Sequence, residues 1–248
     1  MSDMDTNQPD VETTLRIPGA WADPGELLQR MPEGFLLTQE KLILPDGGEV
    51  EFFPMPPDDQ FAGIFRSSCR RLAADDEMKI VDRYSVNIGL AGPGGSLDAA
   101  RRMMQAGAAI VRAGGAGVFI DNSVLAHGGG DWLDYTEDAS PDAVSFAFVS
   151  IVAGEREVWT MGMHVLGHPE VVMRKSDLDE DDEMIIELIR YIAAGEKPIG
   201  EGHYLGDEQS LRFITKAAED NTMTAGSPLH NPFGRLKLVS LKEIAEGN

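Results

Sequence analysis

Cysteine and positive charge are scarce in this 248-residue sequence. The single cysteine, Cys69, excludes a disulfide framework and any metal site built from several thiolates. Only 21 lysine and arginine residues stand against 42 aspartate and glutamate residues, which gives a formal net charge of −21. A surface this negative repels phosphate backbones and anionic lipid. The composition therefore argues against nucleic-acid and membrane partners and favours a basic protein as partner.

Long apolar runs are also missing. The best stretch, residues 106–120, contains Arg112 and four glycines, and it is shorter than the roughly 18 to 20 apolar residues that a spanning helix needs. The N-terminus is polar and acidic, without the basic and apolar segments of a secretory signal. We therefore expect a cytoplasmic protein of a bacterium, with a reduced thiol. Residues 1–12 are expected to be disordered because they have little to bury.

The first half of the chain has strong signals for strands and helices. Asp23-Pro24 marks a helix start, and Asp46-Gly47 lies between two strand-like runs that read as a hairpin. A charged linker is expected at residues 73–79. The expected strands are 13–17, 35–44, 49–53, 84–90 and 117–121, and the expected helices begin at residues 23, 58 or 59, and 96.

The second half is predicted to begin after a turn-rich stretch at residues 128–141. We expect strands at 143–152, 157–163 and 236–241, and an amphipathic helix at 181–194. This order favours an α+β fold of mainly antiparallel sheet layers with helices packed on one face, in two related halves. The predicted boundaries are a half at 13–138, a half at 141–241 and a tail at 242–248.

A glycine loop is the first candidate binding element. Gly94, Gly95 and Ser96 follow a predicted strand and begin a predicted helix, where backbone N–H groups are able to bind an anion. The loop lacks the lysine of a P-loop and the G-x-G-x-x-G spacing. The alternative is a tight turn in which Ser96 caps the helix.

Two histidines and a carboxylate form the second candidate. His164 and His168 are four residues apart, and Glu170 follows. On a helix they could share a metal, but Gly167 and Pro169 oppose a helix. On a strand the two rings would lie roughly 13 Å apart. We therefore predict no metal site, and we take these three residues as a binding site or a structural turn.

Catalytic residues are not evident in the sequence. Cys69 falls on the apolar face of a predicted helix, as expected for a buried thiol. Asp121, Ser123 and His127 supply the residue types of a hydrolytic triad, but the nucleophile elbow G-x-S-x-G is missing. We therefore assign no catalytic residue and no cofactor, and an enzyme is not favoured.

Two segments carry a resemblance to a known family. Residues 85–96, with the following helix and 117–121, resemble the bacterial domain-of-unknown-function 4261 family. Residues 159–170 resemble a later segment of that family and the Gly-His-Pro-Glu form of the related 4262 family. The resemblance runs from about residue 13 to 204. It implies an uncharacterised bacterial protein without an established activity, in which Gly162, Gly167, His168, Pro169 and Glu170 form a shared turn.

These observations lead to one functional hypothesis and two alternatives. The hypothesis is a non-catalytic protein-interaction or regulatory module of the immunity type, which uses its negative charge to attract a basic partner. The first alternative is a small-molecule-binding enzyme or sensor with a pocket near His168 and Glu170. The second is that the charge of −21 is an adaptation to salt and needs no partner. The oligomeric state is not predicted.

Overall fold

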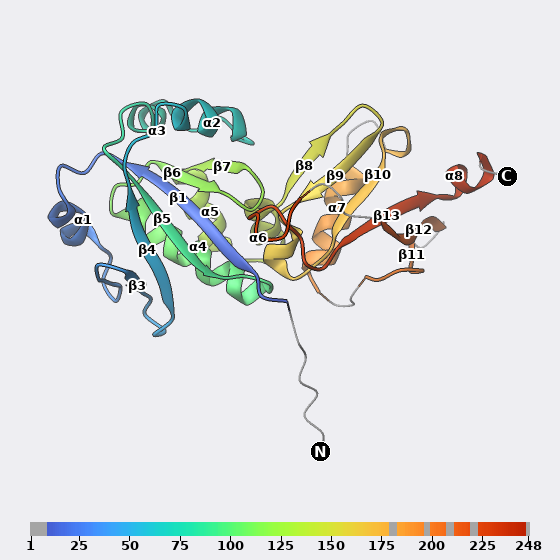
Figure 1. Cartoon of the computed structure of the whole chain (residues 1–248), viewed down its shortest axis with the longest axis horizontal. Coiled ribbons are helices and arrows are strands. Elements are labelled where there is room, and N and C mark those ends of the chain that lie inside the picture. Colours follow the sequence, from blue (N-terminus) through green and yellow to red (C-terminus); the bar gives the residue numbers. More distant parts are fainter. Residues whose placement is uncertain (1–8, 179–182, 196–198, 207–210, 219–222, 247–248) are drawn as a thin grey trace, which may run out of the picture.

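The computed structural model describes residues 9–178, 183–195, 199–206, 211–218 and 223–246. Within these residues the chain has an α+β fold with two mostly antiparallel sheets. The sheets belong to two halves that lie side by side along the longest axis of the molecule (Figure 1). No helix of the described part is long and apolar enough to cross a membrane.

The N-terminal sheet has seven strands in the order β2-β3-β4-β5-β1-β6-β7, all antiparallel. The predicted hairpin is confirmed, and Gly47 takes a positive φ of 83° in its turn. The strands are β1 (Glu12–Gly19), β2 (Leu36–Leu37), β3 (Lys41–Ile43), β4 (Glu49–Met55), β5 (Val86–Pro93), β6 (Gly117–Ile120) and β7 (Leu125–Gly128).

Helices cover the two faces of this sheet unequally. Helix α4 (Leu97–Arg112) packs on one face, and α5 (Gly129–Asp138) and α6 (Pro141–Phe148) pack against α4. On the other face, α2 (Phe61–Ser68) and α3 (Asp75–Val81) form a smaller apolar cluster with β6 and β7. The short helix α1 (Pro24–Arg30) adds Leu27 to the main core. Much of β1, β4 and β5 therefore has one face without a helix.

The C-terminal sheet has six strands in the order β11-β12-β13-β10-β9-β8. Among its described strands, only β10 and β13 pair in parallel. Helix α7 (Glu183–Ala193) contributes Ile185 and Ile189 to the main core beside Met173 and Leu238 of the sheet. The other elements are β8 (Ser150–Ala153), β9 (Glu157–Met161), η1 (Met163–Leu166), β10 (Glu170–Arg174), η2 (Lys175–Asp177), β11 (Tyr204–Gly206), β12 (Leu211–Ala218), β13 (Arg235–Ser240) and α8 (Leu241–Glu246).

Four local predictions are wrong. Residues 35–44 are not one strand, because β2 and β3 lie within them as a separate antiparallel pair. Residues 143–152 are not one strand: Ser140 caps α6 and Pro141 begins it, so the strand β8 starts only at Ser150. The stretch 128–141 is not turn-rich but holds α5, which buries Trp132 against α4. The expected linker at 73–79 holds most of α3, and the Glu77 carboxylate accepts a hydrogen bond from the N–H of Ala74 at its start.

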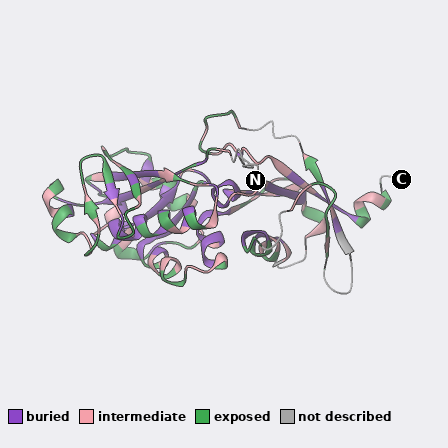
Figure 2. Cartoon of the chain, turned by 90° about the horizontal axis from the view of Figure 1, so that it is seen from below, coloured by how far each residue is buried: buried purple, intermediate pink, exposed green. Residues whose placement is uncertain are grey.

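One continuous apolar core spans the predicted boundary between the two halves. One apolar cluster includes Leu15 and Val118 of the first half and Val171 and Ile185 of the second. Figure 2 shows buried residues along the central strands and exposed residues on the outer helices and loops. Residues 1–8 of the expected disordered N-terminus lie outside the described residues, but Val11 is buried and β1 begins at Glu12. Residues 242–246 of the expected tail belong to α8, which begins at Leu241.

Candidate functional site

The turn between β9 and β10 depends on two glycines in the left-handed region. Gly162 has a φ of 102° and Gly167 a φ of 86°, and they enclose the short helix η1. A Cβ atom on Gly162 would lie 2.3 Å from the carbonyl oxygen of Phe148, and one on Gly167 would lie 2.4 Å from that of Gly95. Residues 162–170 therefore form a tight turn that packs against α6 and the glycine loop before α4.

Glu170 is the centre of this turn and is 8% exposed. Its Oε2 accepts a hydrogen bond from the Thr160 hydroxyl at 2.7 Å. Its Oε1 accepts hydrogen bonds from the N–H groups of Gly162 and Met163 at 3.0 and 3.1 Å, and from the Asn231 side-chain amide at 3.0 Å. Buried carboxylates need such donors to replace water. Both oxygens of Glu170 are therefore used within the fold.

His164 connects Glu170 to the N-terminal half. Its Nδ1 lies 3.3 Å from Glu170 Oε1, and its Nε2 lies 3.2 Å from the side-chain amide nitrogen of Asn122 and 3.0 Å from the carbonyl oxygen of Pro228. Asn122 follows β6 and accepts a hydrogen bond from the N–H of Thr14 in β1. The chain Glu170–His164–Asn122 is thus a buried polar link between the two halves.

A small pocket lies beside this link, with a volume of about 210 Å³. His164 and Asn122 form part of its wall, and Glu12 and His230 face it from other segments. The Nδ1 atom of His230 is buried and has no hydrogen-bond partner among the described residues. The pocket therefore offers polar groups that the fold does not use completely.

His168 does not join His164 and Glu170. Its carbonyl oxygen accepts a hydrogen bond from the Asn231 side chain at 2.9 Å, while burial lowers the pKa of its imidazole. The structure therefore brings His164 and Glu170 together and gives His168 a backbone role in the same turn. The described residues contain no group of three or more histidine, cysteine, aspartate or glutamate side chains that could hold a metal ion.

The glycine loop packs against the same turn. The N–H of Gly94 donates to the carbonyl oxygen of Val11 at 2.7 Å, and the N–H of Gly95 donates to that of Val165 at 3.0 Å. Ser96 caps α4 by accepting a hydrogen bond from the N–H of Ala99. These two glycine donors, which an anion would need, serve contacts within the chain.

The three residues that supply the types of a hydrolytic triad are Asp121, Ser123 and His127. They lie near one another in the sequence but do not contact one another through hydrogen bonds. Asp121 forms an ion pair with Arg16 at 2.9 Å, and burial raises the pKa of Asp121 more than Arg16 lowers it. His127 lies 2.9 Å, through Nε2, from the carbonyl oxygen of Ala147 and is neutral, because burial lowers its pKa to about 4. Ser123 is buried, and its Oγ has no partner in the described structure. No nucleophile–base hydrogen bond joins these three described residues.

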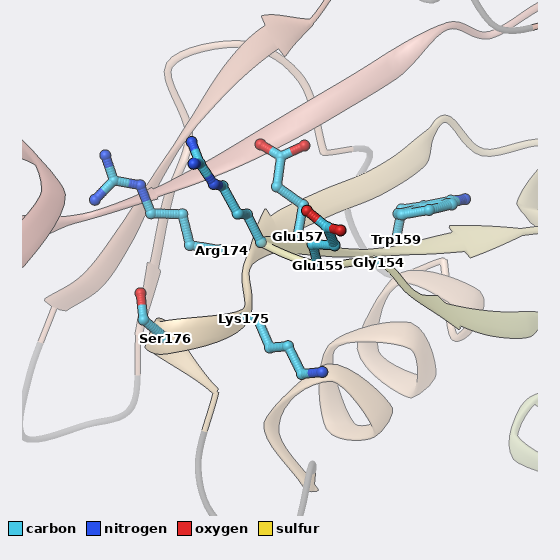
Figure 3. Close-up of a pocket in the computed structure, with 8 residues that line it drawn as sticks. Gly154, Glu155, Glu157, Trp159, Arg174, Lys175 and Ser176 are labelled. Atoms are coloured by element: carbon cyan, nitrogen blue, oxygen red, sulfur yellow. The ribbon is translucent and has the colours of Figure 1, made fainter.

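Another cavity, of about 980 Å³, lies at the β8–β9 turn and the end of β10. Figure 3 shows Glu155 and Glu157 near Trp159, with Arg174 and Lys175 on the neighbouring strand end. Arg174 forms ion pairs with Glu243 and Glu246 of α8, both at 3.1 Å. This cavity is an open surface lined by three basic and two acidic side chains, and it contains none of the candidate residues.

The polar link also contains Thr160, Asn122 and Asn231, which were not predicted as site residues from the sequence. Asn122 and Asn231 lie 42 and 61 residues from their respective partners His164 and Glu170, so no local spacing connects them. The only local signal was the polar Asp121-Asn122-Ser123 turn after a buried strand.

No family model matches this chain, and no curated protein or solved structure matches it either. The resemblance to the domain-of-unknown-function 4261 and 4262 families therefore stays a prediction.

Proposed function

We propose that this chain is a non-catalytic, regulatory protein-interaction module of the bacterial cytoplasm that binds a basic protein. The observation that carries the proposal is the contrast between its carboxylates. Glu170, the acidic candidate for chemistry, has both oxygens occupied by donors of its own fold. Glu170 is the only buried acidic residue in the described part of the chain, whose net charge is −21 over the full sequence. That charge accelerates encounter with a positively charged partner.

The test is a binding panel with the full chain. Purified basic proteins and acidic proteins of matched size are passed over the immobilised chain at several salt concentrations. We expect saturable one-to-one binding of at least one basic protein, with an association rate that falls steeply as salt is raised. Weak, unsaturable binding that follows only the net charge of every basic protein would contradict the proposal, as would no binding at all.

The pocket beside His164 supports a second candidate function, a sensor or enzyme for a small polar molecule. Its volume of about 210 Å³ suits a ligand the size of an amino acid, and His164 Nε2 lies at its wall. Glu170 holds the opposite ring nitrogen, an arrangement that orients an imidazole for proton transfer. His168, by contrast, is not among the residues that line this pocket.

Thermal unfolding with amino acids, nucleotides, sugar phosphates and divalent metals distinguishes the two candidates. Ligand binding to the native state raises the midpoint. A rise caused by one class of ligand, lost in Asn122→Ala and kept in the surface variant Glu155→Ala, would support the pocket. The same midpoint with every compound would leave the interaction module as the better explanation.

A further inference from the structure

Among the described residues, helices leave one face of the N-terminal sheet largely uncovered over β1, β4 and β5, although α3 contacts β1. Strand register places Phe53, Gly89 and Arg16 in one row across this face. The next row holds Glu51, Ala91 and Thr14. We call this surface the open face, and its outward residues include Glu12, Arg16, Glu49, Glu51, Phe53 and Pro93. In Figure 1 it is the broad side of the sheet, with β1, β4 and β5 adjacent.

Phe53 is an apolar anchor on the open face. A Cβ atom on Gly89 would lie 2.1 Å from the Phe53 ring, so the ring rests directly on the backbone of the neighbouring strand. Phe53 is nevertheless 36% exposed. An aromatic ring that is already held in place loses little conformational entropy when a partner covers it. Such rings are frequent centres of protein interfaces.

A groove of about 360 Å³ lies on the same face, beside the row that contains Glu51. Asp10, Glu12, Glu49 and Glu51 line it, and Lys41 is the one cation among its described lining residues. Lys41 forms an ion pair with Glu49, and the neighbouring Arg16 forms one with Asp121. The cations of this surface are therefore already paired, while the groove has a surplus of carboxylates.

We propose that the open face is the docking site for an extended segment of a basic partner protein. In this arrangement a lysine or arginine of the segment enters the groove between Glu12 and Glu51, and an apolar side chain packs on Phe53. The inference rests on the proposed function and adds the surface to it. A second copy of this chain is disfavoured as the occupant, because it also carries a net charge of −21 and would oppose carboxylates with carboxylates.

The experiment uses two fluorescent twelve-residue peptides, one of alternating lysine and leucine and one of alternating glutamate and leucine. Fluorescence anisotropy measures their Kd for the full chain at low and physiological salt. We expect the lysine peptide to bind and the glutamate peptide not to bind. The double variant Glu12→Gln, Glu51→Gln should weaken binding of the lysine peptide at least fivefold, because it removes both carboxylates from the groove.

The matched control is the double variant Asp134→Asn, Glu137→Gln. It changes the net charge equally, but both residues are exposed on α5, which packs behind α4 on the opposite side of the sheet. We expect less than a twofold change in Kd for this control. Phe53→Ala should weaken binding at least threefold and Phe53→Tyr much less, with circular dichroism confirming that each variant is folded.

The remaining outcomes would contradict either the docking site or the proposed function. If both double variants weaken the lysine peptide equally, the open face is not the docking site, although binding of a basic partner still stands. If neither the lysine peptide nor any basic protein binds, the proposed function fails as well. A dimer in sedimentation velocity that Phe53→Ala dissociates would assign the open face to a second copy and overturn the inference.

Discussion

A carboxylate is buried in the β9–β10 turn, whereas carboxylates are exposed on the open face of the N-terminal sheet. In the turn, Glu170 is buried and accepts hydrogen bonds from two backbone N–H groups, a hydroxyl and an amide. On the open face, Glu12 and Glu51 are exposed, and their groove holds only one cation among the described residues. A carboxylate removed from water needs donors from the fold, whereas an exposed one keeps its charge available for a partner. Buried Glu170 therefore stabilises the fold, whereas recognition of a partner is the role that we propose for exposed Glu12 and Glu51.

The largest expected effect comes from removing the buried carboxylate. Glu170→Ala should lower the free energy of unfolding by about 4 kcal/mol, because it leaves several buried donors and His164 without their acceptor. Glu170→Gln keeps the shape of the side chain and should cost less. Urea unfolding followed by circular dichroism measures both. The exposed Glu155→Ala is the control and should stay within about 0.5 kcal/mol; a similarly small loss in Glu170→Ala would remove the distinction.

A second prediction extends the comparison to a buried base. Burial lowers the pKa of His127 from its ordinary value of 6.5 to about 4 in the folded chain. Between these two values the unfolded chain binds more protons than the folded one. Stability therefore falls as pH is lowered from 6.5 to 4, by about 3 kcal/mol for this group.

The variant His127→Gln should lose this contribution, since glutamine does not titrate and its amide is still able to donate to the carbonyl of Ala147. The measurement is the free energy of unfolding at several pH values between 4 and 7 for both proteins. Carboxylates titrate in both, so the difference between the two curves isolates His127. If the free energy of unfolding has the same pH dependence in both proteins, the pKa of His127 is not lowered in the folded chain.

The smallest expected effect concerns the exposed carboxylates. Glu12→Gln with Glu51→Gln should change the free energy of unfolding by no more than about 0.5 kcal/mol at physiological salt. At low salt the double variant should be slightly more stable, because two charges fewer repel within a chain of net charge −21. Thermal unfolding across a salt series measures this. A large loss at any salt would mean that these carboxylates support the fold.

Local chemistry made parts of the fold predictable. Asp23 accepts hydrogen bonds from the N–H groups of Gly25 and Glu26, and Ser96 caps α4, as their positions in the sequence indicated. The stretch 143–152 misled because its β-branched and aromatic residues suit a strand. Ser140 and Pro141 are a helix start, and the burial of Val144 and Phe148 against the core supports α6 instead.

The candidate site was predictable only where its members are close in sequence. His164 and Glu170 lie six residues apart, and the glycines between β9 and β10 indicate a turn that brings them together. Asn122 and Asn231 come from distant segments, and nothing in the sequence pairs them with the turn. Residue type also does not distinguish His164, which joins the network, from His168, which contributes its carbonyl oxygen.

By itself the sequence determined the net charge, the helix caps, the hairpin turn and the α+β class, because these follow from composition and from interactions between near neighbours. The tertiary structure decided which carboxylates are buried and which remain exposed. Glu170 is held inside because strands and loops from remote parts of the chain bring donors to it. Glu51 stays outside because the helices pack on the other face of its sheet and over β6 and β7.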